Sequence, residues 1–70
     1  MPMRLSKEER VKIELLRRQT KEKKSYVRLS VLIMLDAGFT HENIAVSLGI
    51  DSDTVSTYKQ KYQEKGREAI

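Results

Sequence analysis

The sequence predicts an all-α fold, a small helical bundle of about four helices with a helix-turn-helix in its C-terminal half. Apolar residues recur at helical spacing along most of the chain, and no alternating strand pattern is present. Glycines stand where helices are expected to end, at Gly38, Gly49 and Gly66. Because seventy residues leave room for only one small core, we expect a single domain, residues 1–70.

The first helix is expected over residues 6–18. Ser6 and Glu9 have the spacing of a capping box, in which each side chain accepts a hydrogen bond from the other residue's backbone N–H. Four apolar residues are expected to form one buried stripe on this helix: Val11, Ile13, Leu15 and Leu16.

The second helix is expected over residues 21–37, with Thr20 as its cap. Its second half, "LSVLIMLDA", is apolar on nearly every side. Such a helix must be covered from more than one direction, so it is predicted to be the central helix of the core. Gly38 fits the left-handed position that follows a helix end.

The third and fourth helices are expected over residues 41–48 and 52–65, capped by Thr40 and Asp51. In the segment between them Ala45 is small where the two helices cross, and Gly49 occupies the turn. Five apolar residues are predicted to hold the pair at a fixed angle: Ile44, Leu48, Ile50, Val55 and Tyr58. Together these offsets predict a helix-turn-helix of homeodomain-like form over residues 41–60.

Composition excludes several classes of site. The chain has no cysteine and one histidine, His41, so neither a disulfide framework nor a zinc site of the usual kind is expected. No glycine-rich phosphate loop is present, and no hydroxyl has a paired base. A two-metal site would need Asp36, Asp51 and Asp53, two of which are better explained as a cap and a first-turn acid. We therefore expect no catalytic residue, no metal, no cofactor, no small-molecule substrate and no enzyme activity in this chain.

No apolar run is long enough to span a membrane, and the N-terminus "MPMRLSKEER" has no signal-peptide core. The expectation is a cytoplasmic, nucleoid-associated protein without a membrane partner. Net charge is +4, unevenly distributed: +6 over residues 1–28, −4 over residues 29–58 and +2 over residues 59–70. A basic balance favours a nucleic-acid partner, but the helix-turn-helix itself carries no lysine or arginine before Lys59.

In the predicted arrangement the fourth helix lies in the major groove of double-stranded DNA. The residues expected to read bases are Ser52, Asp53, Ser56, Thr57 and Gln60. Asp53 has a second interpretation, as a first-turn acid favoured by the helix dipole. The residues expected to contact the DNA backbone are Arg28, Thr40, Lys59, Lys61 and Lys65.

Three stretches together resemble a known family: "LSKEER" near the start, the joint Gln19-Thr20, and Arg28 leading the apolar helix into Gly38 through Tyr58. The pattern is similar to the N-terminal DNA-binding region of bacterial insertion-sequence transposases of the mariner-like superfamily. The resemblance implies recognition of the inverted repeats at transposon ends. It also implies that a second DNA-binding segment and an RNase H-like catalytic domain usually follow. Two departures are Asn43, in place of a longer acid or amide, and Ser56-Thr57, where arginines are typical.

The sequence thus predicts sequence-specific binding of double-stranded DNA, as in the transposon-end domain of a transposase. Two alternatives stay open: a transcriptional repressor of similar form, and a helical protein-interaction module that does not bind DNA. A homodimer or a following catalytic domain are the protein partners expected.

Overall fold

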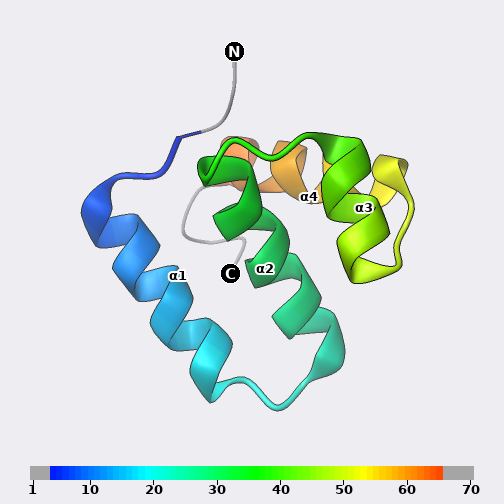
Figure 1. The fold of residues 1–70 in the computed structure, drawn as a ribbon. Coiled ribbons are helices and arrows are strands. Elements are labelled where there is room, and N and C mark those ends of the chain that lie inside the picture. Colours follow the sequence, from blue (N-terminus) through cyan, green and yellow to red (C-terminus); the bar gives the residue numbers. More distant parts are fainter. Residues whose placement is uncertain (1–3, 66–70) are drawn as a thin grey trace.

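The structure, a computed structural model, describes residues 4–65, which form four helices and no strand (Figure 1). They are α1 (Lys7–Gln19), α2 (Lys23–Asp36), α3 (His41–Leu48) and α4 (Ser52–Lys65). The predicted all-α class is confirmed. The expected end of the fourth helix at Gly66 lies outside the described residues.

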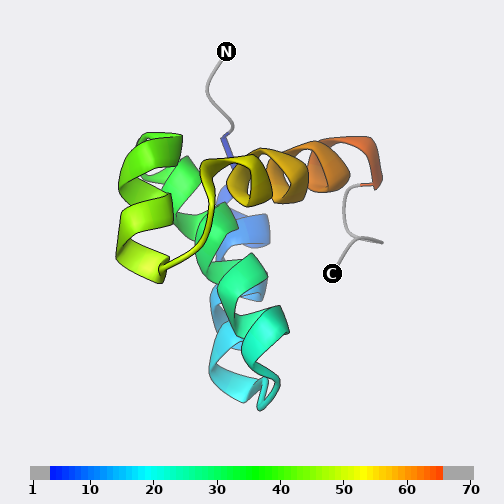
Figure 2. The ribbon, with the colours of Figure 1, turned by 90° about the vertical axis from the view of Figure 1, so that its right-hand side faces the viewer.

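Helices α2, α3 and α4 pack against one another, and α1 packs along α2 on the other side (Figures 1 and 2). A turn joins α1 to α2 at the end of α2 that lies away from α3. Since α2 has 14 residues, that turn is about 20 Å from the start of the α2–α3 connection. The helix-turn-helix and the α1–α2 turn therefore occupy opposite ends of the molecule.

Helix α2 is the centre of the core, as its apolar second half predicted. Val31 and Leu32 are fully buried, and they pack with side chains from each of the other helices. The fully buried partners are Ile13 from α1, Ile44 from α3 and Val55 from α4. A helix covered by three neighbours can bury an almost continuous apolar run.

The predicted buried stripe on α1 is half wrong. Ile13 is fully buried and Leu16 packs against the core, but Val11 and Leu15 are 57% and 51% exposed. Among the described helices, α2 is the one that packs along the length of α1, so one narrow face of α1 is covered. Val11 and Leu15 lie outside that face and are left in solvent.

The start of α1 agrees with the sequence, whereas the predicted start of α2 after Thr20 does not. The predicted capping box is present at Ser6, whose hydroxyl accepts from the Glu9 N–H at 3.1 Å while the Glu9 carboxylate accepts from the Ser6 N–H. Thr20 does not cap α2, because α2 begins only at Lys23. Thr20 instead ends α1, its N–H donating to the Leu16 carbonyl, and its hydroxyl accepts from the Glu22 N–H at 3.4 Å. Glu22 precedes α2 without a side-chain cap, so the first turn of α2 lacks this stabilisation.

Asp36, at the C-terminal end of α2, holds the beginning of the chain. Its carboxylate accepts from the Leu5 N–H at 2.8 Å and from the Arg10 guanidinium at 2.7 Å. These contacts, led by the Leu5 hydrogen bond, lower the pKa of Asp36, although burial opposes them. The partners of Asp36 are far away in the chain, yet an acid inside an apolar run is a signal that a cation or N–H donor must accompany it.

Candidate nucleic-acid interface

The α2–α3 connection is built from backbone hydrogen bonds around Gly38, which has a φ of +94°. The Gly38 N–H donates to the Leu35 carbonyl and the Phe39 N–H to the Met34 carbonyl, the pairing of a Schellman motif. Thr40 then caps α3 as predicted, its hydroxyl accepting from the Asn43 N–H at 3.1 Å. The start of α3 is therefore fixed by the backbone bonds around Gly38 before it and by the Thr40 cap at its first turn.

The turn between α3 and α4 has the geometry that the sequence predicted at Gly49. Gly49 is left-handed, with a φ of +67°, and the Ile50 N–H donates to the Ala45 carbonyl at 3.0 Å. Ala45 is buried, and Val55 is fully buried. A small residue here lets the two helices approach closely.

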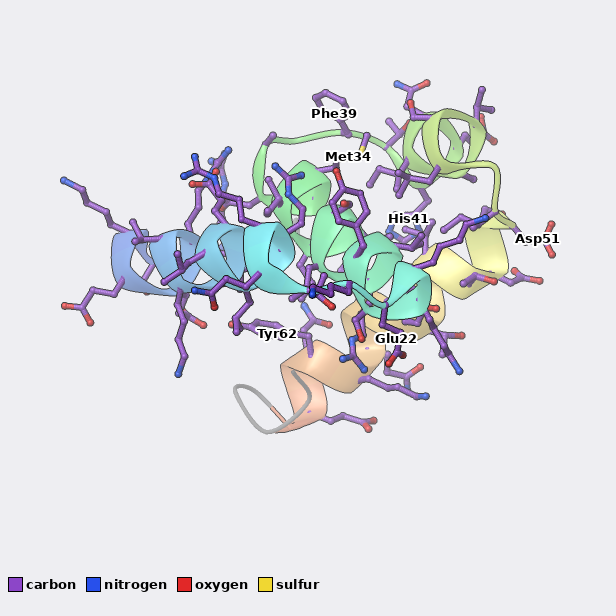
Figure 3. The ribbon with its side chains drawn as sticks, turned by 90° about the horizontal axis from the view of Figure 1, so that it is seen from below. Glu22, Met34, Phe39, His41, Asp51 and Tyr62 are labelled. Carbon is purple, nitrogen blue, oxygen red and sulfur yellow. The ribbon has the colours of Figure 1, made fainter. Side chains whose placement is uncertain are left out.

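The expectation that the Asp51 carboxylate caps α4 is wrong. Within residues 4–65 the Asp51 side chain forms no hydrogen bond, and Figure 3 shows it pointing away from the protein. Its backbone carbonyl instead accepts from the Thr54 and Val55 N–H groups, which begins the helix. The first N–H groups of α4 are thus left available to solvent or to a ligand.

Helix α4 has two distinct faces. Val55 and Tyr62 are buried and Tyr58 is half-buried, so these three turn toward the core. The five predicted base-reading residues lie on the opposite face and are all exposed; we call them the reading face: Ser52, Asp53, Ser56, Thr57 and Gln60. The tertiary structure therefore brings all five together on one accessible helix surface.

Hydrogen bonds within the reading face limit what each side chain can offer. The Thr57 hydroxyl donates to the Asp53 backbone carbonyl at 2.9 Å, which leaves its oxygen as an acceptor. The Gln60 amide nitrogen donates to the Glu64 carboxylate at 3.3 Å. Thr57 is thus suited to accept from an adenine or cytosine amine, and Gln60 keeps its carbonyl free as an acceptor.

His41 is hydrogen-bonded to the reading face, a contact that sequence reasoning missed. Its Nδ1 lies 3.1 Å from the Ser56 hydroxyl, 15 residues along the chain, and its ring lies between α3 and α4 (Figure 3). The hydroxyl donates when Nδ1 carries no proton and accepts when it does. His41 therefore fixes the orientation of Ser56, and only the packing of α3 on α4 could reveal it.

Two lysines flank the reading face. Successive residues of an α-helix are turned by about 100°, so Lys59 and Lys61 emerge on either side of Gln60. Lys61 is exposed and Lys59 is half-buried. If α4 lay in a DNA groove, these two cations could meet the phosphates on its two sides. Lys65 is the last residue of α4, and its side chain lies outside the described part of the structure.

The other two predicted backbone contacts differ in accessibility. Thr40 is exposed, and since its oxygen already accepts from Asn43, its hydroxyl hydrogen is free to meet a phosphate. Arg28 is half-buried, and its Nε–H is enclosed with no acceptor among the described residues. The remaining cations of the first third include a cluster in and beside the α1–α2 turn, at the far end from α3: Arg17, Arg18, Lys21, Lys23 and Lys24.

No group of three or more potential metal-ligating side chains lies together among residues 4–65. Over the same residues no helix has both the length and the apolar character needed to cross a membrane. Of the three acids considered for metal chemistry, Asp36 is paired with Arg10, and Asp51 and Asp53 are exposed.

Residues 26–70 match the model of the Terminase_5 family, described as "Putative ATPase subunit of terminase (gpP-like)". This match covers more than half of the chain and includes most of α2 and all of α3 and α4. The chain belongs to this terminase family. The matched family is a terminase family and not the transposase family that the residue pattern resembles. No curated protein and no solved structure shows significant similarity to the chain. Helix α1 precedes the matched residues.

Proposed function

We propose that the chain is a sequence-specific double-stranded DNA-binding module, with α4 entering the major groove. The observation that carries this proposal is the reading face, five exposed polar residues on one side of α4 with a lysine on each border. A helix of this kind following a tight turn is the part that reads base edges in helix-turn-helix proteins. Membership of a terminase family, whose proteins package phage DNA, supports DNA as the partner.

In this arrangement the neutral side chains of the reading face recognise the bases. The lysines that flank this face, Lys59 and Lys61, attract the DNA phosphates. Ser56 and Thr57 offer a few hydrogen bonds, whereas Asp53 and Glu64 place negative charge near the DNA. Asp53 is compatible with the groove where it accepts from a cytosine amine. Because few cations are close to α4, one copy is expected to bind weakly and with a shallow salt dependence.

In this proposal the chain recognises DNA and does not hydrolyse ATP. The ATPase in the family description requires a site for nucleotide phosphates, and these 70 residues contain no G-x-x-x-x-G-K-[S/T] run. ATP hydrolysis by the purified chain, above the rate of a buffer control, would contradict this part of the proposal.

The experiment that tests DNA binding is a selection of duplexes from a random pool at fixed salt, followed by anisotropy titrations. Thr57→Ala should change the selected sequence with little effect on affinity for unrelated duplexes. Lys61→Ala should weaken all duplexes alike and reduce the salt slope by about 0.9. Lys12→Ala, on the exposed side of α1, is the matched control and should leave both unchanged. If the Thr57 and Lys61 variants both lost affinity equally for all duplexes, α4 would not be reading bases.

A second candidate is recognition of transposon ends, which the pattern from Gly38 to Tyr58 favours. The selected sequence distinguishes it from DNA packaging. Enrichment of a sequence that recurs as inverted repeats flanking the gene would support transposition, and enrichment of a site present once in a phage genome would support packaging. No salt-dependent binding to any duplex would instead favour the protein-interaction module.

A further inference from the structure

Helix α1 exposes an apolar pair that no described residue covers. Val11 and Leu15 lie one turn apart, are more than half exposed, and line a shallow depression together with Lys7, Glu8 and Lys12. An exposed apolar patch rimmed by charged side chains can serve as a contact surface, and here the charges at its two ends decide what can bind. The surface is separate from the reading face, because α1 lies on the other side of α2.

The exposed pair is the middle of a longer stripe, which we call the α1 seam: Glu8, Val11, Leu15 and Arg18. Its spacings of three, four and three residues are those that align side chains along the contact line of two paired helices. The seam carries a negative charge at one end and a positive charge at the other. Glu8 and Arg18 are both exposed, and neither has an ion pair or hydrogen bond among residues 4–65.

We propose that the α1 seam binds the α1 seam of a second copy of this chain, antiparallel, about a twofold axis at the level of Ile13. Residue numbers on opposite helices then sum to 26, so Val11 contacts the second copy's Leu15 and Glu8 meets its Arg18. Each contact occurs twice, as a twofold interface requires. A parallel pair would instead set Glu8 against Glu8 and Arg18 against Arg18, which like charges disfavour. The charge pattern thus selects both the partner and its direction.

The pairing is weak by itself. Two aliphatic side chains from each copy bury much less than the ~800 Å² per partner of a stable interface. It gains strength where the two copies are held near each other, because a high effective concentration replaces missing contact area. In the proposed function, adjacent DNA sites supply that concentration, and the twofold axis predicts an inverted repeat of half-sites.

Cross-linking tests the register directly, since the chain has no cysteine of its own. A mixture of Val11→Cys and Leu15→Cys chains, oxidised without DNA, should form a disulfide several times faster than either variant alone. Val11→Cys mixed with Lys24→Cys, on exposed α2 surface, is the control and should cross-link slowly. Equal rates in all mixtures would overturn the proposed register.

Sedimentation equilibrium of the whole chain tests the charges. Glu8→Arg or Arg18→Glu alone should weaken self-association by roughly fivefold, and the double variant should restore it, because reversed charges still attract. Failure of the double variant to recover, or no self-association of the unaltered chain at millimolar concentration, would overturn the proposal. Leu15→Glu should remain folded and still bind a duplex with one half-site, so loss of pairing and loss of DNA binding are separable.

Discussion

The Tyr62 hydroxyl, near the end of α4, donates a 2.5 Å hydrogen bond to the Glu9 carboxylate in the first turn of α1. The two residues are 53 positions apart, and the same Glu9 carboxylate also accepts from the Ser6 N–H. This bond joins the first and last helices, whose backbones do not approach each other closely within residues 4–65. The bond thereby fixes the position of α4 relative to α1, the helix that carries the α1 seam.

Tyr62→Phe should therefore lower the free energy of unfolding by about 1.5 kcal/mol, since a partly buried hydrogen bond to a charged acceptor is lost while the ring remains. Urea denaturation followed by circular dichroism measures this. Tyr26→Phe is the matched control, because its ring is exposed beside Arg17 and should change stability by less than about 0.5 kcal/mol. Equal effects in both variants would mean that the Glu9 contact contributes nothing.

Asp36 predicts a loss of stability in acid. Its pKa is lowered in the folded protein, mainly by the Leu5 N–H and then by the Arg10 guanidinium. The unfolded chain consequently binds a proton at higher pH than the folded one does. The Asp36 contribution is fully present above the ordinary aspartate pKa and is lost as pH falls through the lowered value.

Asp36→Asn should flatten the stability profile between about pH 5 and pH 2, measured by urea denaturation at each pH. Asp53→Asn, an exposed acid without a described hydrogen bond of its side chain, should keep the profile of the unaltered protein. The idea fails if the two variants show the same acid response.

Gly49 predicts a ranked series of substitutions. A β-carbon there would meet no heavy atom within 4 Å, so the cost of a side chain comes from the φ of +67° alone. Asn tolerates this region best, Ala should cost about 1 kcal/mol, and Val, being β-branched, about 2 kcal/mol. Thermal unfolding gives the order, and a Val variant as stable as the Asn variant would contradict the left-handed turn.

Ser30 predicts a stabilising substitution. Its side chain is buried in α2, and its hydroxyl has no hydrogen-bond partner among the described residues. Replacement by Ala removes an unsatisfied polar group and improves helix propensity, so Ser30→Ala should gain about 1 kcal/mol. Ser25→Ala, half-buried in the same helix, controls for propensity alone. A loss of stability in Ser30→Ala would show that the hydroxyl has a partner, such as a bound water.

His41 predicts a coupling to base recognition that depends on Ser56. His41→Ala frees the Ser56 hydroxyl to rotate, and the affinity for the selected duplex should fall by about threefold, equivalent to a modest neutral hydrogen bond. In a Ser56→Ala background the same change should have no further effect. An equal loss in both backgrounds would assign His41 to a phosphate contact, independent of Ser56.

Local chemistry made much of this protein predictable from its sequence. The capping box at Ser6, the left-handed glycines at positions 38 and 49, and the cap at Thr40 each depend on residues within a few positions of one another. The exposure of one face of α4 was equally predictable, because the 3.6-residue period sets Ser52, Ser56 and Gln60 apart from Val55 and Tyr62. The same short-range reasoning failed at Thr20, because α2 begins only at Lys23. It also failed at Asp51, whose backbone carbonyl accepts from the Thr54 and Val55 N–H groups while its carboxylate does not.

The sequence by itself determined the helices, their turns and the polarity of α4, since these follow from contacts close in the chain. Only the tertiary structure decided which faces are covered and which distant groups meet. Both Val11–Leu15 and Ile13–Leu16 have the spacing of neighbours on one helix face. Helix α2 covers Ile13 and Leu16 and leaves Val11 and Leu15 exposed. The bonds from Asp36 to Leu5, from Tyr62 to Glu9 and from Ser56 to His41 join different elements, so each depends on how the helices pack. Periodicity assigns a side chain to a face, whereas burial depends on whether another helix lies against that face.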